Sequence, residues 1–558
     1  MRYQLADGVT TVKFVRPAHG LVALFGADVV PVTALGLTAG RDTLGHRFMS
    51  SGAVSFADAD AYAATLAEKG HVVASFEGRR DEIQRQLLDH AGRLSATLGD
   101  DPEVAALLDE VTALVEHPTV YVGQFEEQFL QVPQECLILT MRLNQKYFPL
   151  FDPATGRLTH RFLIVSNMHT DNPVNIVEGN QRVVRPRLAD AQFFFETDRK
   201  TPLAARVEQL GSIVYHNKLG TQLERVERVR AIARDVAGKL GSDFTAADRA
   251  ALLAKADLGS NMVGEFPELQ GIMGAYYAAG DGEPDSVVQA LRNQYRNRYD
   301  APVTQDGLTA AALFIAERAE TLVGIWAIGL APTGERDPFG LRRAALGLIS
   351  AFEQLAAGGW LKLNQDGPLS LDGLLAATAA TFPAGKIPAE TLAEVRTFIY
   401  ERYRNQLIND HDRNAVEAVI ALTPPLHQVA ERVRAAAAFA QLPEAASLAA
   451  ANKRIGNLLK KAEGEIGTVN DAALVEPAEK ALAAAIAALR PQAEAQRAAG
   501  DFAANLRTLA QAREPVDAFF ADIMVMADDP AVRANRLALL GQLHTLMNQV
   551  ADISRLAQ

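Results

Sequence analysis

The chain has 558 residues, of which 49% are hydrophobic and 22% charged, and its net charge at pH 7 is -12. This composition excludes a disordered chain, and the acidic balance excludes a protein that coats nucleic acid with a uniformly positive surface. Its single cysteine, Cys136, excludes a disulfide framework and lies in an apolar run that predicts a core position. With no signal peptide and no long apolar run, we expect a cytoplasmic protein that makes no contact with a membrane.

The first 200 residues predict a mixed α/β domain. Short β-branched or aromatic runs at 9–15, 118–123, 136–141 and 161–168 are typical of strands, and the spacing of apolar residues at 59–70 and 102–116 is typical of helices. Turn residues separate these segments. A multidomain α+β fold is therefore predicted, and the length is compatible with three or four domains.

After about residue 201 the strand-like runs disappear, and apolar residues recur at steps of three and four. We predict a helical domain at 201–345, a helical linker at 346–400 and a C-terminal helical domain at 401–558. Gly-, Pro- and Asp-rich breaks suggest these boundaries. No repeat of fixed period is present, which disfavours a solenoid.

Common catalytic motifs are absent from the sequence, including a phosphate-binding glycine loop, HExxH, CxxC and GxSxG. His411 and Asp412 resemble a metal-binding pair at first sight. Because they stand just before a helical pattern, we interpret Asp410 or Asp412 as a helix N-cap instead.

A helix predicted at 447–463 has one apolar face, and a second, polar face carries Lys453, Asn457, Lys460 and Lys461, with Arg454 beside it. Such a face is either an ordinary solvated surface or a contact for RNA phosphates and base edges. Further along, Arg533 and Arg536 lie three residues apart. They could pair with Asp528 or Asp529 or with a phosphate, and the sequence does not decide between these alternatives.

Two long segments, 255–274 and 314–347, carry the runs KADLGSNMVGEFPELQGIMG and, within the second, DPFGLRRA. These runs resemble the β subunit of bacterial two-subunit glycyl-tRNA synthetases. Further similar stretches occur in the same order along the chain, at 14–21, 43–48, 143–152, 183–198, 216–229, 447–461 and 516–540. The resemblance thus covers essentially the whole chain.

The resemblance implies a B3/B4-like N-terminal domain, an HD-like middle and a C-terminal domain similar to the arginyl-type anticodon-binding domains. It implies a subunit that recognises tRNA(Gly) while a separate α subunit activates glycine, in an α2β2 tetramer. ATP and Mg²⁺ are then substrates of the holoenzyme, and none is expected on this chain. The residues expected to bind tRNA are Lys453, Arg454, Asn457, Lys460, Lys461, Arg533 and Arg536.

Two departures from the family pattern stand out. The usual N-terminal segment with a Glu-Ile-Gly-Thr-Glu-Glu-Leu-Pro-like motif is missing, which predicts a truncated chain or a different start site. The family's Ala-Asp-Lys-x-Asp-Thr-Leu run is replaced by Ala316 to Leu322 with glutamates at 317 and 320, so the negative charges are kept.

By the same resemblance, the metal-binding His-Asp pair of HD hydrolases falls on Ala256 and Asp257, so the imidazole is lost. His216 and either Glu317 or Glu320 could fill the outer positions. A catalytic metal needs several convergent ligands, so we expect a relic scaffold without metal rather than a metal-dependent phosphohydrolase. A purely structural helical scaffold is the third alternative, and it predicts no affinity for tRNA.

Overall fold

The computed structural model describes residues 2–4, 11–13, 18–365, 367–462 and 466–556. The chain forms two compact units: unit 1 contains residues 1–200 and 265–269, and unit 2 contains residues 201–264 and 270–558. The division near 200 lies where the sequence changes from mixed to helical. Helices run through residues 345 and 400, and the finer domain limits there stay predictions.

Unit 1 begins with small antiparallel hairpins, each made of two consecutive strands. Their tight turns use residues with positive φ, such as Gly26 at 57° and Gly36 at 76°. A small core of Val54, Phe56 and Leu66 holds the last hairpin against the first helix. The elements are β1 (Arg2–Gln4), β2 (Thr11–Lys13), β3 (Leu24–Phe25), β4 (Asp28–Val29), β5 (Thr33–Ala34), β6 (Leu37–Thr38), β7 (Asp42–Leu44), β8 (Ala53–Ser55) and α1 (Tyr62–Glu68).

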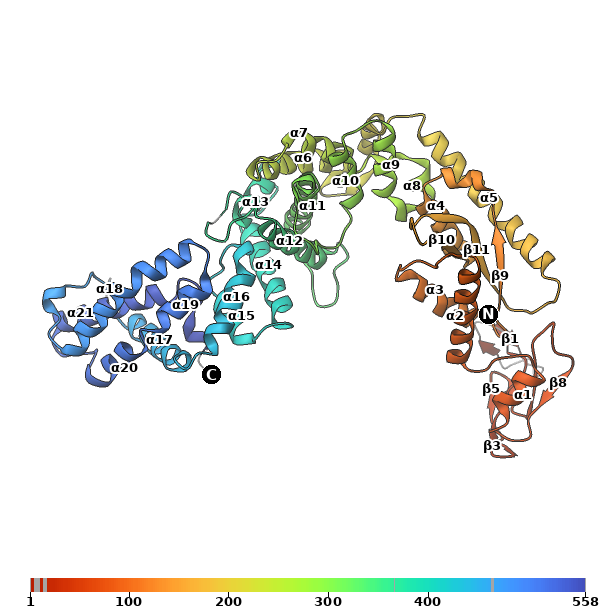
Figure 1. Ribbon diagram of the computed structural model, residues 1–558, viewed down its shortest axis with the longest axis horizontal. Helices are drawn as coiled ribbons and strands as arrows, with labels where there is room; N and C mark the ends of the chain where they lie inside the picture. Colours follow the sequence, from red (N-terminus) through yellow and green to blue (C-terminus); the bar gives the residue numbers. More distant parts are fainter. Residues whose placement is uncertain (1, 5–10, 14–17, 366, 463–465, 557–558) are drawn as a thin grey trace. The chain divides into compact units, whose positions relative to one another are not determined.

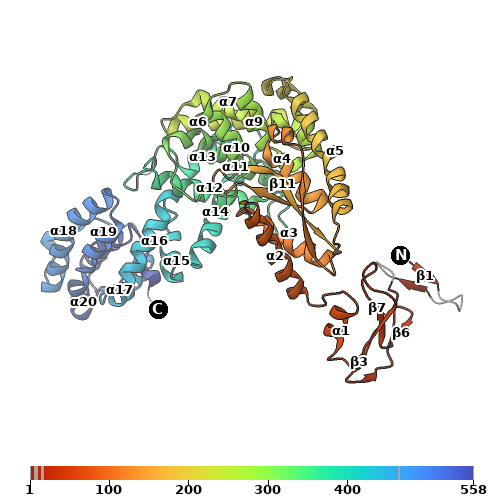
Figure 2. The ribbon, with the colours of Figure 1, turned by 45° about the vertical axis from the view of Figure 1, so that its right-hand side comes forward.

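The rest of unit 1 is a three-stranded antiparallel sheet of order β10-β11-β9 packed against helices (Figure 2). Gly123 lies opposite Phe162, and a Cβ at Gly123 would come within 2.5 Å of the Phe162 ring, so glycine is required there. The elements are α2 (Phe76–Arg93), α3 (Glu103–Leu114), β9 (Thr119–Gln124), η1 (Glu127–Gln131), α4 (Gln134–Leu139), η2 (Thr140–Asn144), β10 (Phe148–Phe151), β11 (Leu158–Ser166) and α5 (Val174–Asp198).

The strand predicted at 136–141 is wrong. The structure places these residues in α4 and the following π turn η2, after Pro133. A short apolar run without alternating polar residues does not distinguish helix from strand, and leucine accepts either. The structure confirms that Cys136 is a core residue, with no exposed surface.

Unit 2 is built around α11, in which 16 of 20 residues are buried (Figure 1). Helices α6, α7, α10, α12 and α13 contact it. One short strand pair, β12-β13, interrupts the region expected to be helical. The elements are η3 (Leu203–Ser212), β12 (Val214–His216), β13 (Gly220–Thr221), α6 (Gln222–Lys239), α7 (Phe244–Leu253), η4 (Ala256–Gly259), α8 (Asn261–Glu265), α9 (Ile272–Gly280), α10 (Asp285–Asn293), η6 (Gln305–Gly307), α11 (Leu308–Ala327), α12 (Leu341–Ala357), α13 (Leu371–Ala379) and α14 (Thr391–Ile408). Between α8 and α9, the turn η5 (Pro267–Leu269) belongs to unit 1.

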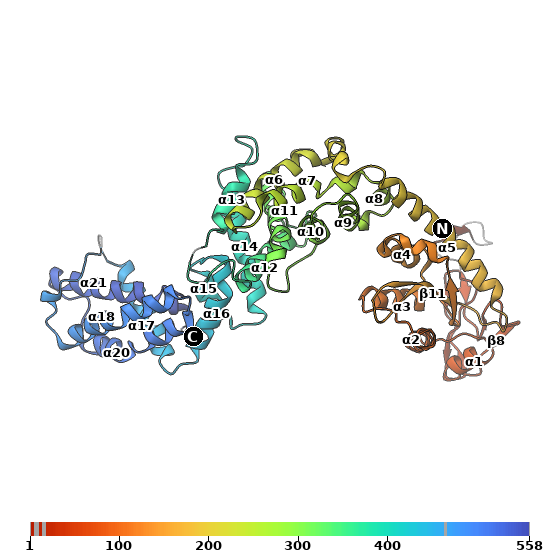
Figure 3. The ribbon, with the colours of Figure 1, turned by 45° about the horizontal axis from the view of Figure 1, so that its top comes forward.

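The C-terminal part of unit 2 is a helical bundle (Figure 3). Asp412 accepts a hydrogen bond from the Ala415 amide at 3.0 Å and begins α15, which confirms the N-cap interpretation of the 409–414 segment. The elements are α15 (Arg413–Ile420), α16 (Leu426–Ala440), α17 (Ala445–Lys460), η7 (Asp471–Ala473), α18 (Pro477–Ala498), α19 (Phe502–Ala510), α20 (Arg513–Asp522), α21 (Pro530–Met547) and η8 (Ile553–Leu556).

Three predicted features reach beyond the described residues. Residues 9, 10, 14 and 15 of the strand-like run at 9–15 lie outside them. Residues 14–17 of the family-like stretch at 14–21 lie outside them, as does Glu463, the predicted end of the helix at 447–463. In the part of the chain that is described, no helix is both long and apolar enough to cross a membrane.

Candidate nucleic-acid interface

Helix α17 presents the predicted basic face to solvent. Its opposite side buries Leu448 and Ile455 in the bundle, so the apolar periodicity in the sequence fixes the orientation of the helix. Lys453, Asn457 and Lys460 follow at steps of four and three residues and are exposed. They therefore lie on one side of the helix.

These three side chains line a groove of about 850 Å³. Helix α17 forms one wall. The other walls come from α15, with Asn414 and Glu417, from the end of α21, with His544, and from the final turn η8, with Arg555. The groove is therefore assembled from segments that are distant in the sequence.

A pair of asparagines positions the walls. The Asn452 amide donates to Asn548 Oδ1 at 2.8 Å, and the Asn548 amide donates back to Asn452 Oδ1 at 3.1 Å. Asn452 has no exposed surface. Because a buried amide is costly unless its hydrogen bonds are satisfied, this reciprocal pair fixes α17 against the end of α21.

The acidic groups in the groove are already paired. Asp552 Oδ2 lies 3.1 Å from Arg555 Nε. Glu417 forms an ion pair with Arg404, and the hydrogen bond from Arg404 lowers the pKa of the Glu417 carboxyl. In contrast, none of the carboxylates that the structure describes pairs with Lys453 or Lys460. Burial is the main cause that lowers the pKa of His544, with a smaller contribution from the charge of Lys460. Two lysines thus supply free positive charge to the groove.

Arg454 and Lys461 are on the same helix but do not line the groove. The Arg454 guanidinium lies over the Phe520 ring, 4.4 Å from its centroid, and Lys461 is an exposed residue at the end of the helix. The spacing in the sequence places all five residues on or beside one face of the helix. The structure separates Arg454 and Lys461 from the three that line the groove.

The sequence suggests Asp528 or Asp529, or a phosphate, as the partner of Arg533 and Arg536. In the structure, both arginines bind other groups of the chain. Arg536 forms an ion pair of 2.5 Å with Glu479, whose side chain is 3% exposed, and also donates to the Met524 carbonyl. Arg533 donates to the Ala527 carbonyl at 3.0 Å. Asp529 caps α21 by accepting from the Ala531 amide. Arg536 therefore links α21 to α18, and Arg533 links α21 to the segment just before it.

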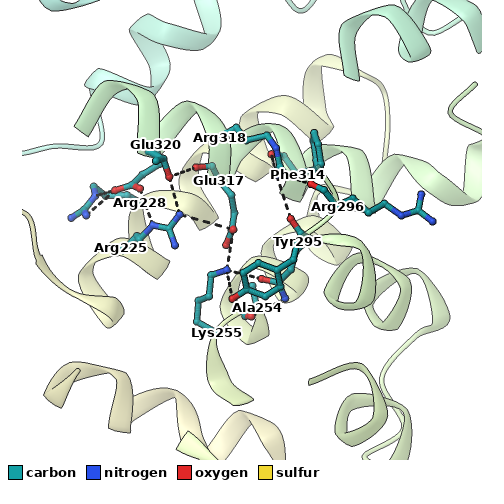
Figure 4. A network of polar contacts seen from close by, with 12 residues as sticks. Arg225, Arg228, Ala254, Lys255, Tyr295, Arg296, Phe314, Glu317, Arg318 and Glu320 are labelled. Carbon is teal, nitrogen blue, oxygen red and sulfur yellow. Dashed lines mark hydrogen bonds and ion pairs between the residues drawn. The ribbon is translucent and has the colours of Figure 1, made fainter. Parts of the chain in front are cut away.

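A second polar cluster occupies the part of unit 2 where the sequence analysis places an HD-like domain (Figure 4). Glu320 accepts from Arg225 at 2.9 Å and pairs with Arg228 at 2.8 Å. Glu317 pairs with Lys255 at 3.0 Å, and burial lowers the pKa of Lys255 to about 8. The carboxylates expected at the outer metal positions are therefore bound to cations.

Asp257 and His216 are also engaged within the chain. The Asp257 carboxylate accepts from the amides of Gly271 at 2.5 Å and Gly274 at 2.9 Å, and burial raises its pKa to about 6. His216 Nδ1 accepts from the Lys218 amide. Among the described residues, no group of three or more His, Cys, Asp or Glu side chains is arranged to hold a metal ion, so the geometry disfavours the phosphohydrolase alternative.

Comparison with known proteins decides between the remaining alternatives. Residues 1–421 match the model of the glycyl-tRNA synthetase β subunit family, and residues 448–553 match that of the DALR anticodon binding domain. The chain belongs to the glycyl-tRNA synthetase β subunit family. This membership confirms the predicted family and the multidomain α+β fold class.

The relatives of this β subunit sequence include glycine-tRNA ligase β subunits from Janthinobacterium sp. (strain Marseille), Thiobacillus denitrificans and Ralstonia nicotianae, which are 54%, 53% and 52% identical to it. All of the chain aligns with each of them and covers 78% of each relative's length. Most of the groove at α17 falls within the part that matches the anticodon-binding domain, including Asn452 and Asn548. Arg555, His544 and Asn414 were missed from the sequence because no local pattern links them to α17.

Proposed function

We propose that this chain acts as the tRNA-handling β subunit of a two-subunit glycine-tRNA ligase, and that the groove at α17 receives part of tRNA(Gly). The proposal depends on Lys453 and Lys460, two lysines with which none of the described carboxylates forms an ion pair. Both line the groove, and both lie in the part of the chain that matches the anticodon-binding domain. Ammonium groups contact phosphates, and the amide of Asn457 can hydrogen-bond to base edges. The match to tRNA-binding domains favours this function over an idle solvated face.

The proposal assigns glycine activation to the α subunit, in a cytoplasmic α2β2 assembly. ATP and Mg²⁺ are substrates of that holoenzyme and do not bind to this chain. The family membership supports the existence of an α partner, since relatives are described as β subunits. The absence of phosphate-binding motifs from the sequence agrees with this division of tasks.

The activity is tested by adding the α subunit. With glycine and ATP, the isolated chain should give no pyrophosphate exchange, whereas the mixture should attach glycine to tRNA(Gly). Glycine-dependent exchange by the isolated chain would contradict the assignment. Failure of the mixture to charge tRNA, although the two subunits co-purify, would contradict it as well.

A neighbouring pair of lysines tests the groove. We expect Lys460→Ala to weaken tRNA(Gly) binding and to reduce the slope of log affinity against log salt by roughly 0.7 to 0.9, the amount for one phosphate contact. Lys461→Ala, which removes the same charge one residue outside the groove lining, should leave both quantities unchanged. Binding titrations at several salt concentrations measure the two effects.

Stability provides the control for this pair. Both lysines are exposed, and surface substitutions usually change the free energy of unfolding by less than about 0.5 kcal/mol. Thermal unfolding of the two variants should therefore match the wild type. Equal loss of tRNA affinity in both variants would mean that the helix contributes only a diffuse positive charge.

A further inference from the structure

A second groove, distinct from the one at α17, lies in unit 2 between α12, α14 and the segment that follows α10. Its volume is about 470 Å³. Four arginines line it: Arg298, Arg342, Arg343 and Arg402. Four side-chain amides and the hydroxyl of Ser350 complete the polar lining, and none of the described lining residues is acidic.

The arginines are not neutralised by internal ion pairs. Within the described residues, no carboxylate pairs with Arg298, Arg343 or Arg402. Arg342 instead donates to the Gly334 carbonyl. Arg402 lies over the Phe398 ring, 5.4 Å from the centroid, and its buried Nε has no hydrogen-bond partner in the described structure.

Such a concentration of positive charge is unusual for a chain of net charge -12. Like charges held together repel one another, and a buried N–H group without an acceptor costs free energy. An anion that enters the groove relieves the repulsion between the arginines. The lining is therefore arranged for an anionic ligand.

An adjoining hollow of about 340 Å³ shares Asn297 and Arg343 with the groove. Its charged lining consists of four arginines and one carboxylate, Glu317, which is paired with Lys255. There Arg318 donates to the carbonyls of Gln294, Phe314 and Arg296, and this holds the segment after α10 in place (Figure 4). Burial lowers the pKa of Arg318 to about 10, so it stays charged at neutral pH. An extended, fixed and positive surface suits a polymeric anion better than a single ion.

We propose that this arginine groove, formed around Arg298, Arg343 and Arg402, binds the sugar-phosphate backbone of tRNA as a second RNA contact. The inference rests on the proposed function, because only a tRNA-binding subunit would present such a surface to RNA. Guanidinium forks match phosphate oxygens in two-point hydrogen bonds, and the amides of Asn297 and Asn405 can bond to ribose hydroxyls. Because phosphate contacts carry no sequence information, the groove supplies affinity and position rather than identity.

The experiment measures binding of the 558-residue chain to a tRNA(Gly) transcript and to a non-cognate tRNA at several salt concentrations. The test variant is Arg298→Ala with Arg343→Ala. The matched control is Arg234→Ala with Arg497→Ala, two exposed arginines outside both grooves. A third protein, Arg298→Lys with Arg343→Lys, keeps the charges and removes the guanidinium forks.

We expect the test variant to bind both tRNAs about tenfold more weakly at low salt and its salt slope to fall by roughly 1.4 to 1.8, the amount for two phosphate contacts. The lysine variant should recover most of the salt slope but not all of the affinity, and the control should match the wild type. In phosphate footprinting, the test variant should lose protection at a set of phosphates different from the set lost in Lys460→Ala.

Distinct results would overturn the inference and the proposed function. Wild-type affinity in the test variant, together with weakened binding by Lys460→Ala, would overturn the arginine groove and leave the proposed function standing. Binding of polyglutamate but not tRNA through Arg298 and Arg343 would also overturn the inference. Absence of tRNA binding by the wild-type chain, alone and with the α subunit, would overturn both.

Discussion

Replacing Glu320 with alanine should lower the free energy of unfolding of unit 2 by about 3–5 kcal/mol, the usual cost of removing one partner from a buried ion pair. The Glu320 side chain is fully buried and neutralises both Arg225 and Arg228, whose side chains are 10% and 8% exposed. The two guanidiniums also rest on the rings of Tyr215 and Phe382, which keep them in the interior. Without Glu320, Arg228 loses its carboxylate partner, and Arg225 keeps only Glu317, at 4.0 Å.

Urea denaturation followed by tryptophan fluorescence measures this effect, because both tryptophans, Trp326 and Trp360, lie in unit 2. The matched control is Glu227→Ala on the same helix as the two arginines. Glu227 pairs with Arg230 at 3.0 Å but its side chain is 55% exposed, so its loss should cost less than about 1 kcal/mol. Similar losses in the two variants would show that the Glu320 cluster is not a buried ion-pair network.

Replacing Asp257 with asparagine should change how stability depends on pH. Burial raises the pKa of this carboxyl from 3.8 to about 6 in the folded chain. Between these values the folded state holds a proton that the unfolded state has released, so the contribution of Asp257 to the stability of the wild type falls as pH rises through this window. The total decrease is about 3 kcal/mol at 1.36 kcal/mol per pH unit.

Asparagine cannot titrate, but its carbonyl can still accept from the Gly271 and Gly274 amides. The stability of Asp257→Asn relative to the wild type should therefore increase from pH 4 to pH 6 and stay constant above it. Lys255 and Glu317 are present in both proteins, so their titration largely cancels in the difference. A difference that does not vary with pH would show that Asp257 titrates at its ordinary pKa.

The sequence alone determined features that depend on local pattern. The apolar residues of α17 recur at helical spacing, so they fixed which side of the helix faces solvent and therefore that Lys453, Asn457 and Lys460 are exposed. Asp412 stood before a helical pattern with a side chain that can accept from the first turn, and it is the N-cap of α15. Long family-like runs in the right order identified the family, because such matches need no three-dimensional information.

The tertiary structure decided features that depend on partners distant in the sequence. Arg536 has an internal role because folding brings it to Glu479, 57 residues earlier in the chain. The groove depends on a hydrogen bond between Asn452 and Asn548, which are 96 residues apart. The run at 136–141 is helix rather than strand, and the sequence could not show this, because a short apolar run has no alternation that separates the two. The sequence suggests Glu317 or Glu320 as a metal ligand. In the structure their carboxylates bind Lys255, Arg225 and Arg228, and only folding brings these cations to them.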